Sequence, residues 1–184
     1  MQAIDLLLNR NSYPKLQDPA PKGEDRERIF QAALRAPDHA MLKPSRFLVI
    51  EGDRRKTLAL DMADTMFTSN PLATDAEMTK VQNSLRRAPL VIVAICKGID
   101  HPKIPHIEQI LSTGCAIHQM LLAAESLGFG GIWRTGPLAY DAGILKLMGL
   151  APGESIVGYL YLGTPAGERK VLPALNTADF FKAK

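Results

Sequence analysis

The stretch LGFGGIWRTG, residues 127–136, decides the fold. Its glycines allow two interpretations, a loop that binds phosphate or a helix end followed by a strand. A dinucleotide-binding loop needs G-x-G-x-x-G between a strand and a helix. Here Trp133 stands in place of the third glycine, and the stretch leaves a predicted helix and enters a predicted strand, which is the reverse order. We therefore expect Gly128 to end the helix in the left-handed conformation that glycine adopts without a Cβ penalty.

The flanking segments alternate between strand and helix patterns. Apolar residues on both faces of PLVIVAIC (89–96) predict a central strand. The long segment 106–127 predicts a helix of about 30 Å, and its second half is apolar nearly all round, as in a helix buried between layers. Further strands are expected at 46–52, 130–133 and 155–163, and further helices at 3–9, 24–35, from Asp53 to about 67, from a Thr74–Glu77 capping box to about 87, and at 140–148. This order predicts an α+β or α/β layered domain.

Composition restricts the class of protein. The chain has 184 residues, of which 46% are hydrophobic and 22% charged, as expected for one globular domain over residues 1–184. The net charge of +3 is scattered and forms no basic stripe, so no nucleic acid partner is expected. No signal peptide is recognised at the start, and the longest apolar run, residues 88–96, is too short to span a membrane. Cys96 and Cys115 form no CxxC pair, which favours reduced thiols and a cytoplasmic location.

Motifs for nucleophilic or metal chemistry are weak. Ser12 and Lys15 match the SxxK pattern of acyl-transfer enzymes, but Pro14 opposes the helix that this pattern needs, and SDN and KTG motifs are missing. The four histidines follow no metal-ligand spacing, so no metal site is expected. His39 differs from the other three because it lies in the proline-bracketed loop RAPDHAMLKP, and such loops often carry binding residues.

Several arginines occur at the predicted ends of elements, where their planar fork suits phosphates and carboxylates. Arg10 follows the first helix together with Ser12, and Arg35 precedes the histidine loop. Arg134 ends a strand beside Trp133. These residues predict anion binding but no particular reaction.

Four segments in register carry a family resemblance: NRNS (9–12), RAPDHAMLKPSRFLVIEG (35–52), STGCAIHQMLLAAESLGFGGIWRTG (112–136) and GYLYLGTP (158–165). Together they resemble the nitroreductase family of flavoenzymes, specifically its short bacterial NAD(P)H nitroreductases. The resemblance implies an α+β fold with a central, mostly antiparallel sheet flanked by helices. It also implies an interlocked homodimer with one non-covalent FMN per subunit at the interface. The tail, about 164–184, would pack on the partner subunit.

The resemblance also implies site residues. Arg10, Asn11 and Ser12 would hold the phosphate and ribityl end of FMN, and Arg35 and His39 would contact FMN, with His39 reaching across the interface. A further FMN segment would be Trp133, Arg134 and Thr135. Nicotinamide nucleotide contacts would come from Ala123, Ala124, Glu125, Ser126, Leu127 and Gly128.

The implied reaction carries hydride from NAD(P)H through flavin N5 to a small-molecule electron acceptor, such as a nitroaromatic or quinone, in a ping-pong cycle. No side chain acts as a catalyst, because the cofactor carries the chemistry. Two alternatives stay open, a poorly catalytic flavin-binding or sensing protein of this fold and a Ser12–Lys15 hydrolase.

Two positions depart from the family pattern. Asn11 stands where a basic residue is common, so weaker FMN binding is expected. Lys43-Pro44-Ser45 replaces Gln-Pro-Trp, so a roomier and more polar substrate pocket is expected.

Overall fold

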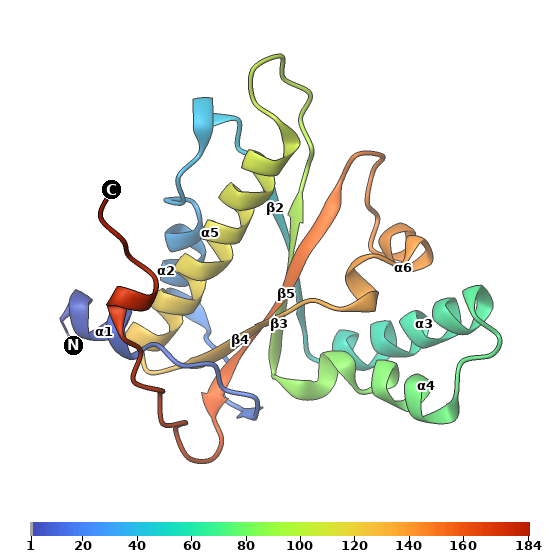
Figure 1. Cartoon of the computed structure of the whole chain (residues 1–184). Helices are drawn as coiled ribbons and strands as arrows, with labels where there is room; N and C mark the ends of the chain where they lie inside the picture. The colour runs from blue at the N-terminus through green and yellow to red at the C-terminus, as the bar shows by residue number, and fades with distance from the viewer. Residues whose placement is uncertain (1) are drawn as a thin grey trace.

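The computed structural model describes residues 2–184 and has an α+β fold, in which helices cover both faces of a five-stranded sheet (Figure 1). The strands are β1 (Leu16–Gln17), β2 (Ser45–Glu51), β3 (Leu90–Cys96), β4 (Gly130–Arg134) and β5 (Ser155–Pro165). The helices are α1 (Ala3–Asn9), α2 (Gly23–Ala33), α3 (Arg54–Ser69), α4 (Asp75–Gln82), α5 (His106–Ser126) and α6 (Ala142–Leu147). Single 3-10 turns are η1 (His39–Met41), η2 (Ser84–Arg87), η3 (Pro137–Ala139) and η4 (Thr177–Asp179).

All strand pairs of the sheet are antiparallel. The order is β1-β5-β3-β2, and β4 pairs with β5. Every residue of β3 is buried, which confirms the predicted central strand. An antiparallel sheet excludes the doubly wound dinucleotide-binding fold, which needs parallel strands joined by crossover helices.

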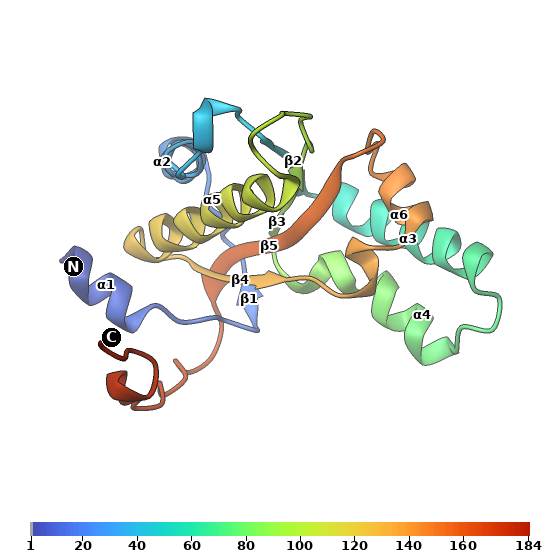
Figure 2. The same cartoon turned by 45° about the horizontal axis from the view of Figure 1, so that its top comes forward.

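The two faces of β3 belong to two separate hydrophobic cores. Val91, Val93 and Ile95 pack with α3, α4 and α6, whereas the alternate residues Leu90 and Ile92 pack with α2 and α5. This period of two is the side-chain alternation of a strand that is covered on both sides. Figure 2 shows the two helical groups on opposite sides of the sheet.

The backbone around Gly128 distinguishes a phosphate-binding loop from a helix end. Gly128 has φ +85°, and its N–H donates to Glu125 O at 3.1 Å. The Phe129 N–H donates to Ala124 O at 2.9 Å. These two bonds form a Schellman motif that satisfies the last carbonyls of α5. The prediction of a helix end followed by a strand is confirmed.

Some predicted boundaries were wrong. The helix that opens at the Thr74 capping box ends at Gln82 rather than near 87, and the separate turn η2 buries Ser84 and Leu85. Asp53 precedes α3 but makes no side-chain cap. The predicted helix 140–148 is shorter because the Asp141 side chain caps its start by accepting from the Ile144 N–H at 2.9 Å. Within residues 2–184, no helix combines the length and apolar character needed to cross a membrane.

Candidate functional site

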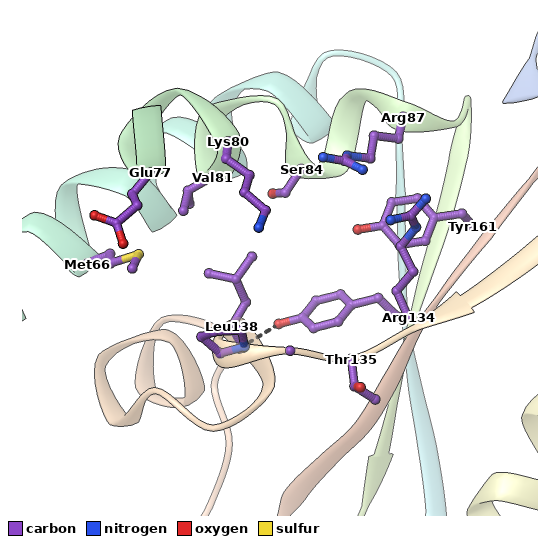
Figure 3. A pocket seen from close by; sticks show the side chains of 13 residues that line it. Met66, Glu77, Lys80, Val81, Ser84, Arg87, Arg134, Thr135, Leu138 and Tyr161 are labelled. Carbon is purple, nitrogen blue, oxygen red and sulfur yellow. Dashed lines mark hydrogen bonds between the residues drawn. The ribbon is translucent and has the colours of Figure 1, made fainter. Parts of the chain in front are cut away.

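A cleft of about 490 Å³ opens beside the end of β4 and is termed the β4 cleft (Figure 3). One wall comes from α3, α4 and η2, and the other from β4, η3 and β5. Its lining residues are Met66, Glu77, Lys80, Val81, Ser84, Arg87, Arg134, Thr135, Gly136, Pro137, Leu138, Tyr159 and Tyr161. The cleft therefore includes two predicted site residues, Arg134 and Thr135.

The β4 cleft has an excess of positive charge. Lys80, Arg87 and Arg134 line it, and none of them forms an ion pair with another side chain of residues 2–184. Its one lining carboxylate, Glu77, accepts hydrogen bonds from the Thr74 N–H and hydroxyl, each at 2.9 Å. These bonds lower the pKa of Glu77 and hold its charge at the start of α4. The remaining cations suit an anionic or electron-rich ligand.

Two buried polar atoms of the β4 cleft have no partner within residues 2–184. They are Ser84 Oγ and Arg134 Nε, and Ser84 is only 7% exposed. The Arg134 guanidinium carbon lies 5.9 Å from the centre of the Tyr161 ring. Because buried polar groups are normally hydrogen-bonded, these two atoms mark where a polar ligand would add the missing contacts.

The tyrosines supply an aromatic floor. The Tyr159 hydroxyl donates to Leu138 O at 2.9 Å. Burial raises the pKa of both Tyr159 and Tyr161, although Arg134 and Arg87 partly offset this effect at Tyr161. Both phenols are therefore neutral at neutral pH and act as apolar surface rather than as bases.

The Arg10–Ser12 segment directly precedes Tyr13, which contacts the outer edge of β4. The Tyr13 N–H donates to Gly131 O at 3.0 Å, so that carbonyl points away from β5. In an antiparallel ladder, alternate residues point the same way, so the amide and carbonyl of Trp133 also face the outer edge. Gly131 precedes Arg134 by three residues, which is about 10 Å along a strand. β4 thus extends from the residue that Tyr13 contacts to the β4 cleft.

Arg10 and Asn11 have different surroundings. Arg10 is partly exposed and makes one long hydrogen bond, from Nη1 to Ser12 Oγ at 3.4 Å. Asn11 is 5% exposed, and its Nδ2 donates to Lys170 O at 2.7 Å. Its Oδ1 accepts from the Ser12 N–H at 2.9 Å. Arg10 and Ser12 are therefore available to a ligand, whereas both polar atoms of the Asn11 side chain are hydrogen-bonded inside the protein.

Trp133 faces α5, on the opposite side of β4 from the β4 cleft. Its indole Nε1 donates to Val157 O at 3.3 Å, at a bulge where Val157 has no partner on β3. A Cβ on Gly158 would lie 2.0 Å from the same nitrogen. The indole is therefore held against the backbone of β5, and Trp133 is 37% exposed.

The segment Ala123–Gly128 closes α5 next to the Arg10–Ser12 segment. Ala124 is fully buried, and the Ser126 hydroxyl donates to Ala123 O at 2.8 Å. Glu125 is the charged residue of this segment, and its Oε2 accepts from the Asn11 N–H at 3.0 Å. Contact of Ala123–Gly128 with a nicotinamide nucleotide stays a prediction.

Arg35 and His39 lie on another part of the surface, along α5. His39 Nδ1 is 2.6 Å from Glu108 Oε2, and Arg35 O accepts from Gln119 Nε2 at 3.3 Å. One chain does not bring them to the β4 cleft, so their contact with the same ligand needs a second subunit.

The loop after His39 is conformationally strained. Ala40, Met41 and Lys43 have φ of 58°, 53° and 51°, in the region that L-residues rarely adopt. The Asp38 carboxylate holds this loop by accepting from the Leu42 N–H at 3.2 Å and the Lys43 N–H at 2.7 Å. Ser45 lies beneath α5, where its Oγ is 2.9 Å from Thr113 Oγ1. Lys43 and Ser45 do not line the β4 cleft.

Lys80, Ser84 and Arg87 were missed by the sequence analysis. In the expected continuous helix to residue 87, these three side chains would lie on one face, because they are four and three residues apart, but that face was given no role. The break after Gln82 instead turns Ser84 into the protein and places Arg87 beside Tyr161 (Figure 3). The signal in the sequence was the basic pair Arg86-Arg87 directly before a buried strand.

Comparison with known proteins identifies the family. The profile of the nitroreductase family matches residues 7–164. The chain belongs to the nitroreductase family. The Escherichia coli (strain K12) protein named "Putative NAD(P)H nitroreductase YdjA" is 38% identical over 179 residues, covering 97% of this chain and 96% of the relative.

Solved nitroreductase-like structures share the fold. A nitroreductase-like family protein from Bacillus cereus has a TM-score of 0.84 at 21% identity, covering 100% of this chain and 96% of that one. A Desulfovibrio desulfuricans structure, described as "a putative nitroreductase in complex with fmn", has a TM-score of 0.74 at 21% identity, covering 98% and 96% of the two chains. The nitroreductase fold expected from the sequence is thus confirmed.

Proposed function

We propose that this nitroreductase-family chain is an FMN-dependent NAD(P)H oxidoreductase. Membership of the family supports the reaction class, and the name of the Escherichia coli relative gives NAD(P)H as its reductant. The observation that carries the proposal is the presence of arginine and hydroxyl groups without an ion-pair partner at both ends of β4: Arg10 and Ser12, just before the Tyr13 contact with Gly131, and Arg134 and Thr135 at the β4 cleft.

The residues present fit FMN. Arg10 and Ser12 offer a guanidinium and a hydroxyl to a phosphate, and arginine binds such dianions bidentately. The β4 cleft offers aromatic and aliphatic walls for a flat ring system. Its orphaned polar atoms, Ser84 Oγ and Arg134 Nε, would find partners on the polar edge of that ring system. β4 rises about 10 Å from Gly131, which Tyr13 contacts, to Arg134, a span that suits a ribityl chain.

When bound, FMN would accept a hydride at N5 from NAD(P)H and pass it to an electron acceptor such as a nitroaromatic or quinone, in a ping-pong cycle. The chain's own part is to bind and orient. Lys80, Arg87 and Arg134 would compensate negative charge at the polar edge of the ring. The outward-facing amide of Trp133 would orient the ring along β4. No side chain is assigned a nucleophilic or proton-transfer role.

We also propose a homodimer with a flavin in each of two interface clefts. The α5 stripe, defined as Ile107, Leu111 and Cys115, is apolar and exposed at helical spacing. A dimer across this stripe would bury it and bring Arg35 and His39 of one subunit toward the site of the other. The apolar residues of the tail, including Val171 (96% exposed) and Phe181 (79% exposed), would pack on the partner.

The two alternatives make different demands on the site. A hydrolase that uses Ser12 and Lys15 needs both on one helical turn, but residues 11–15 are not helical. The Lys15 carbonyl accepts from the Ala166 N–H at 3.0 Å, so the backbone here bonds to the chain after β5 and not within a helix. A poorly catalytic flavin binder would use the same residues as the enzyme and differs only in turnover.

Fluorescence titration of FMN with the purified apoprotein tests the proposed site. We expect saturable quenching with one FMN per chain, and weaker binding in both Arg10→Gln and Arg134→Gln. Arg54→Gln, which removes an exposed arginine of α3 outside the β4 cleft, is the matched control. Equal FMN affinity in all three variants would refute the assignment.

A further inference from the structure

An acidic side chain lies next to the segment proposed to bind phosphate. Glu125 lies in the last turn of α5, and its side chain is only 9% exposed. Its Oε2 accepts from the Asn11 N–H at 3.0 Å, and its Oε1 lies 2.6 Å from Arg169 Nη2. A carboxylate beside a phosphate site opposes anion binding unless a cation compensates it. Arg169 supplies that compensation from the C-terminal part of the chain.

The residues after β5 form a strap along the N-terminal segment, defined here as residues 164–170. Leu16 and Gln17 pair with Pro165 and Thr164, and the Ala166 N–H donates to Lys15 O at 3.0 Å. Further along, Arg169 Nη2 donates to Asn9 O. Figures 1 and 2 both show the C-terminal chain returning beside α1.

Asn11 ties the strap to the Arg10–Ser12 segment. Its side-chain amide donates to Lys170 O at 2.7 Å, and its Oδ1 accepts from the Ser12 N–H at 2.9 Å. Three groups thus converge on the segment: the Glu125 carboxylate from α5, and the Lys170 carbonyl and Arg169 guanidinium from the strap. The backbone of residues 9–12 is fixed from both sides, while the side chains of Arg10 and Ser12 stay available.

We infer that Glu125 and Arg169 are positioning residues that hold the Arg10–Ser12 segment in the conformation that binds the phosphate of FMN. The inference rests on the proposed function. Neither side chain needs to contact FMN, because each acts through the backbone of Asn9 or Asn11. Asn11 belongs to the same clasp, so it holds the segment in place rather than replacing a lost phosphate ligand.

This assignment gives Glu125 a different role from a nucleotide contact. If Glu125 positions the segment, its loss weakens FMN binding and leaves the affinity for NAD(P)H unchanged. If it contacts the nicotinamide nucleotide, its loss changes the KM for NAD(P)H and leaves FMN binding unchanged. The two roles therefore separate in measurable quantities.

The test compares Glu125→Gln, Arg169→Gln and the double variant, with Glu168→Gln on the strap as control. We expect each single change to raise the Kd for FMN about tenfold, as for residues that orient ligand-binding groups. The double variant should be no weaker than the singles, because both changes break one clasp. Arg169→Lys should recover part of the affinity. The KM for NAD(P)H at saturating FMN should stay within about twofold of wild type.

Limited trypsin digestion of the apoprotein gives a second readout that needs no FMN. Breaking the clasp should speed cleavage after Arg10, whereas Glu168→Gln should not. Unchanged Kd and unchanged cleavage in both single variants would overturn the inference, as would a raised KM for NAD(P)H with unchanged Kd for FMN. A wild-type protein that binds no FMN but shows the expected cleavage differences would refute the proposed function and retain the clasp.

Discussion

The position of the Trp133 side chain depends on two glycines that have no Cβ. The indole fits against β5 because Gly158 has no Cβ, and a Cβ there would lie 2.0 Å from Nε1. A Cβ on Gly114 of α5 would lie 3.2 Å from the far edge of the ring, which a small shift can relieve. The indole therefore lies against two glycines. A Cβ at Gly158 would clash with it, whereas a Cβ at Gly114 would need only a small shift.

Gly158→Ala should displace the indole and break its hydrogen bond to Val157 O, at a cost of about 1–3 kcal/mol in the free energy of unfolding. Trp133 is the one tryptophan in the sequence, so intrinsic fluorescence reports on it directly. We expect a red-shifted emission maximum in Gly158→Ala and a much smaller change in Gly114→Ala. Equal spectra for the two variants would contradict this packing.

Among the ion pairs of residues 2–184, Glu154 and Arg46 have the least exposed pair of side chains. Arg46 Nε donates to Glu154 Oε1 at 2.7 Å, and the Ala151 N–H donates to Oε2 at 2.9 Å. The hydrogen bond from Arg46, followed by that from Ala151, lowers the pKa of Glu154, although partial burial opposes the shift. The pair joins β2 to the loop before β5.

A carboxyl with a lowered pKa in the folded state stabilises the fold above its unfolded pKa of about 4.3 and loses this contribution as the pH falls through the folded value. Glu154→Gln should therefore cost about 1–3 kcal/mol at pH 7 and much less near pH 3. Urea unfolding at both pH values measures this. Glu51→Gln removes the more exposed pair with Arg26 and should cost under about 1 kcal/mol. A loss in Glu154→Gln that is independent of pH would contradict the assignment.

At the scale of elements, the end of α5 depends on Gly128. Its φ of +85° is strained for any residue with a Cβ, so Gly128→Ala should cost about 1–2 kcal/mol of stability. FMN affinity should change little, because the glycine ends a helix and contacts no phosphate. Thermal unfolding and FMN titration of the same sample check both statements. Unchanged stability with lost FMN binding would restore the interpretation as a phosphate-binding loop.

Much of the fold followed from elements with strong local signals. The apolar residues of β3 predicted a central strand, and the Thr74–Glu77 pair predicted the start of α4, which the structure confirms with a capping box. The predicted end of α4 was wrong, because the burial of Leu85 in the core is a tertiary effect that helical periodicity does not report. The proline-bracketed loop around His39 was expected, but nothing in the sequence indicated its positive φ angles at non-glycine residues.

At the scale of the whole molecule, the predicted site residues fall into two groups. Arg10–Ser12, Ala123–Gly128 and Trp133–Thr135 lie around β4 and the end of α5, whereas Arg35 and His39 lie farther along α5. Sequence segments could suggest both groups but could not place them, because their distance depends on how the sheet and α5 pack. The Lys80–Arg87 wall of the β4 cleft depends on the same packing and was missed.

The α5 stripe should hold two subunits together. Leu111 is 61% exposed at its centre, so Leu111→Lys should place a charge in the dimer interface and shift the protein toward monomers. Leu60→Lys on α3, where the leucine is 43% exposed, is the control and should leave assembly unchanged. Sedimentation velocity distinguishes the two species. A dimer that persists in Leu111→Lys would place the interface elsewhere.

The most direct test of the proposed oxidoreductase is the visible spectrum of the FMN-loaded protein before and after anaerobic addition of NADH, followed by NADPH. We expect a yellow flavin spectrum that bleaches when at least one of the two nucleotides is added and returns when a quinone is added. A bound flavin that neither nucleotide reduces would contradict the enzymatic claim and favour a flavin-binding protein. A protein that takes up no FMN at all would contradict the cofactor assignment itself.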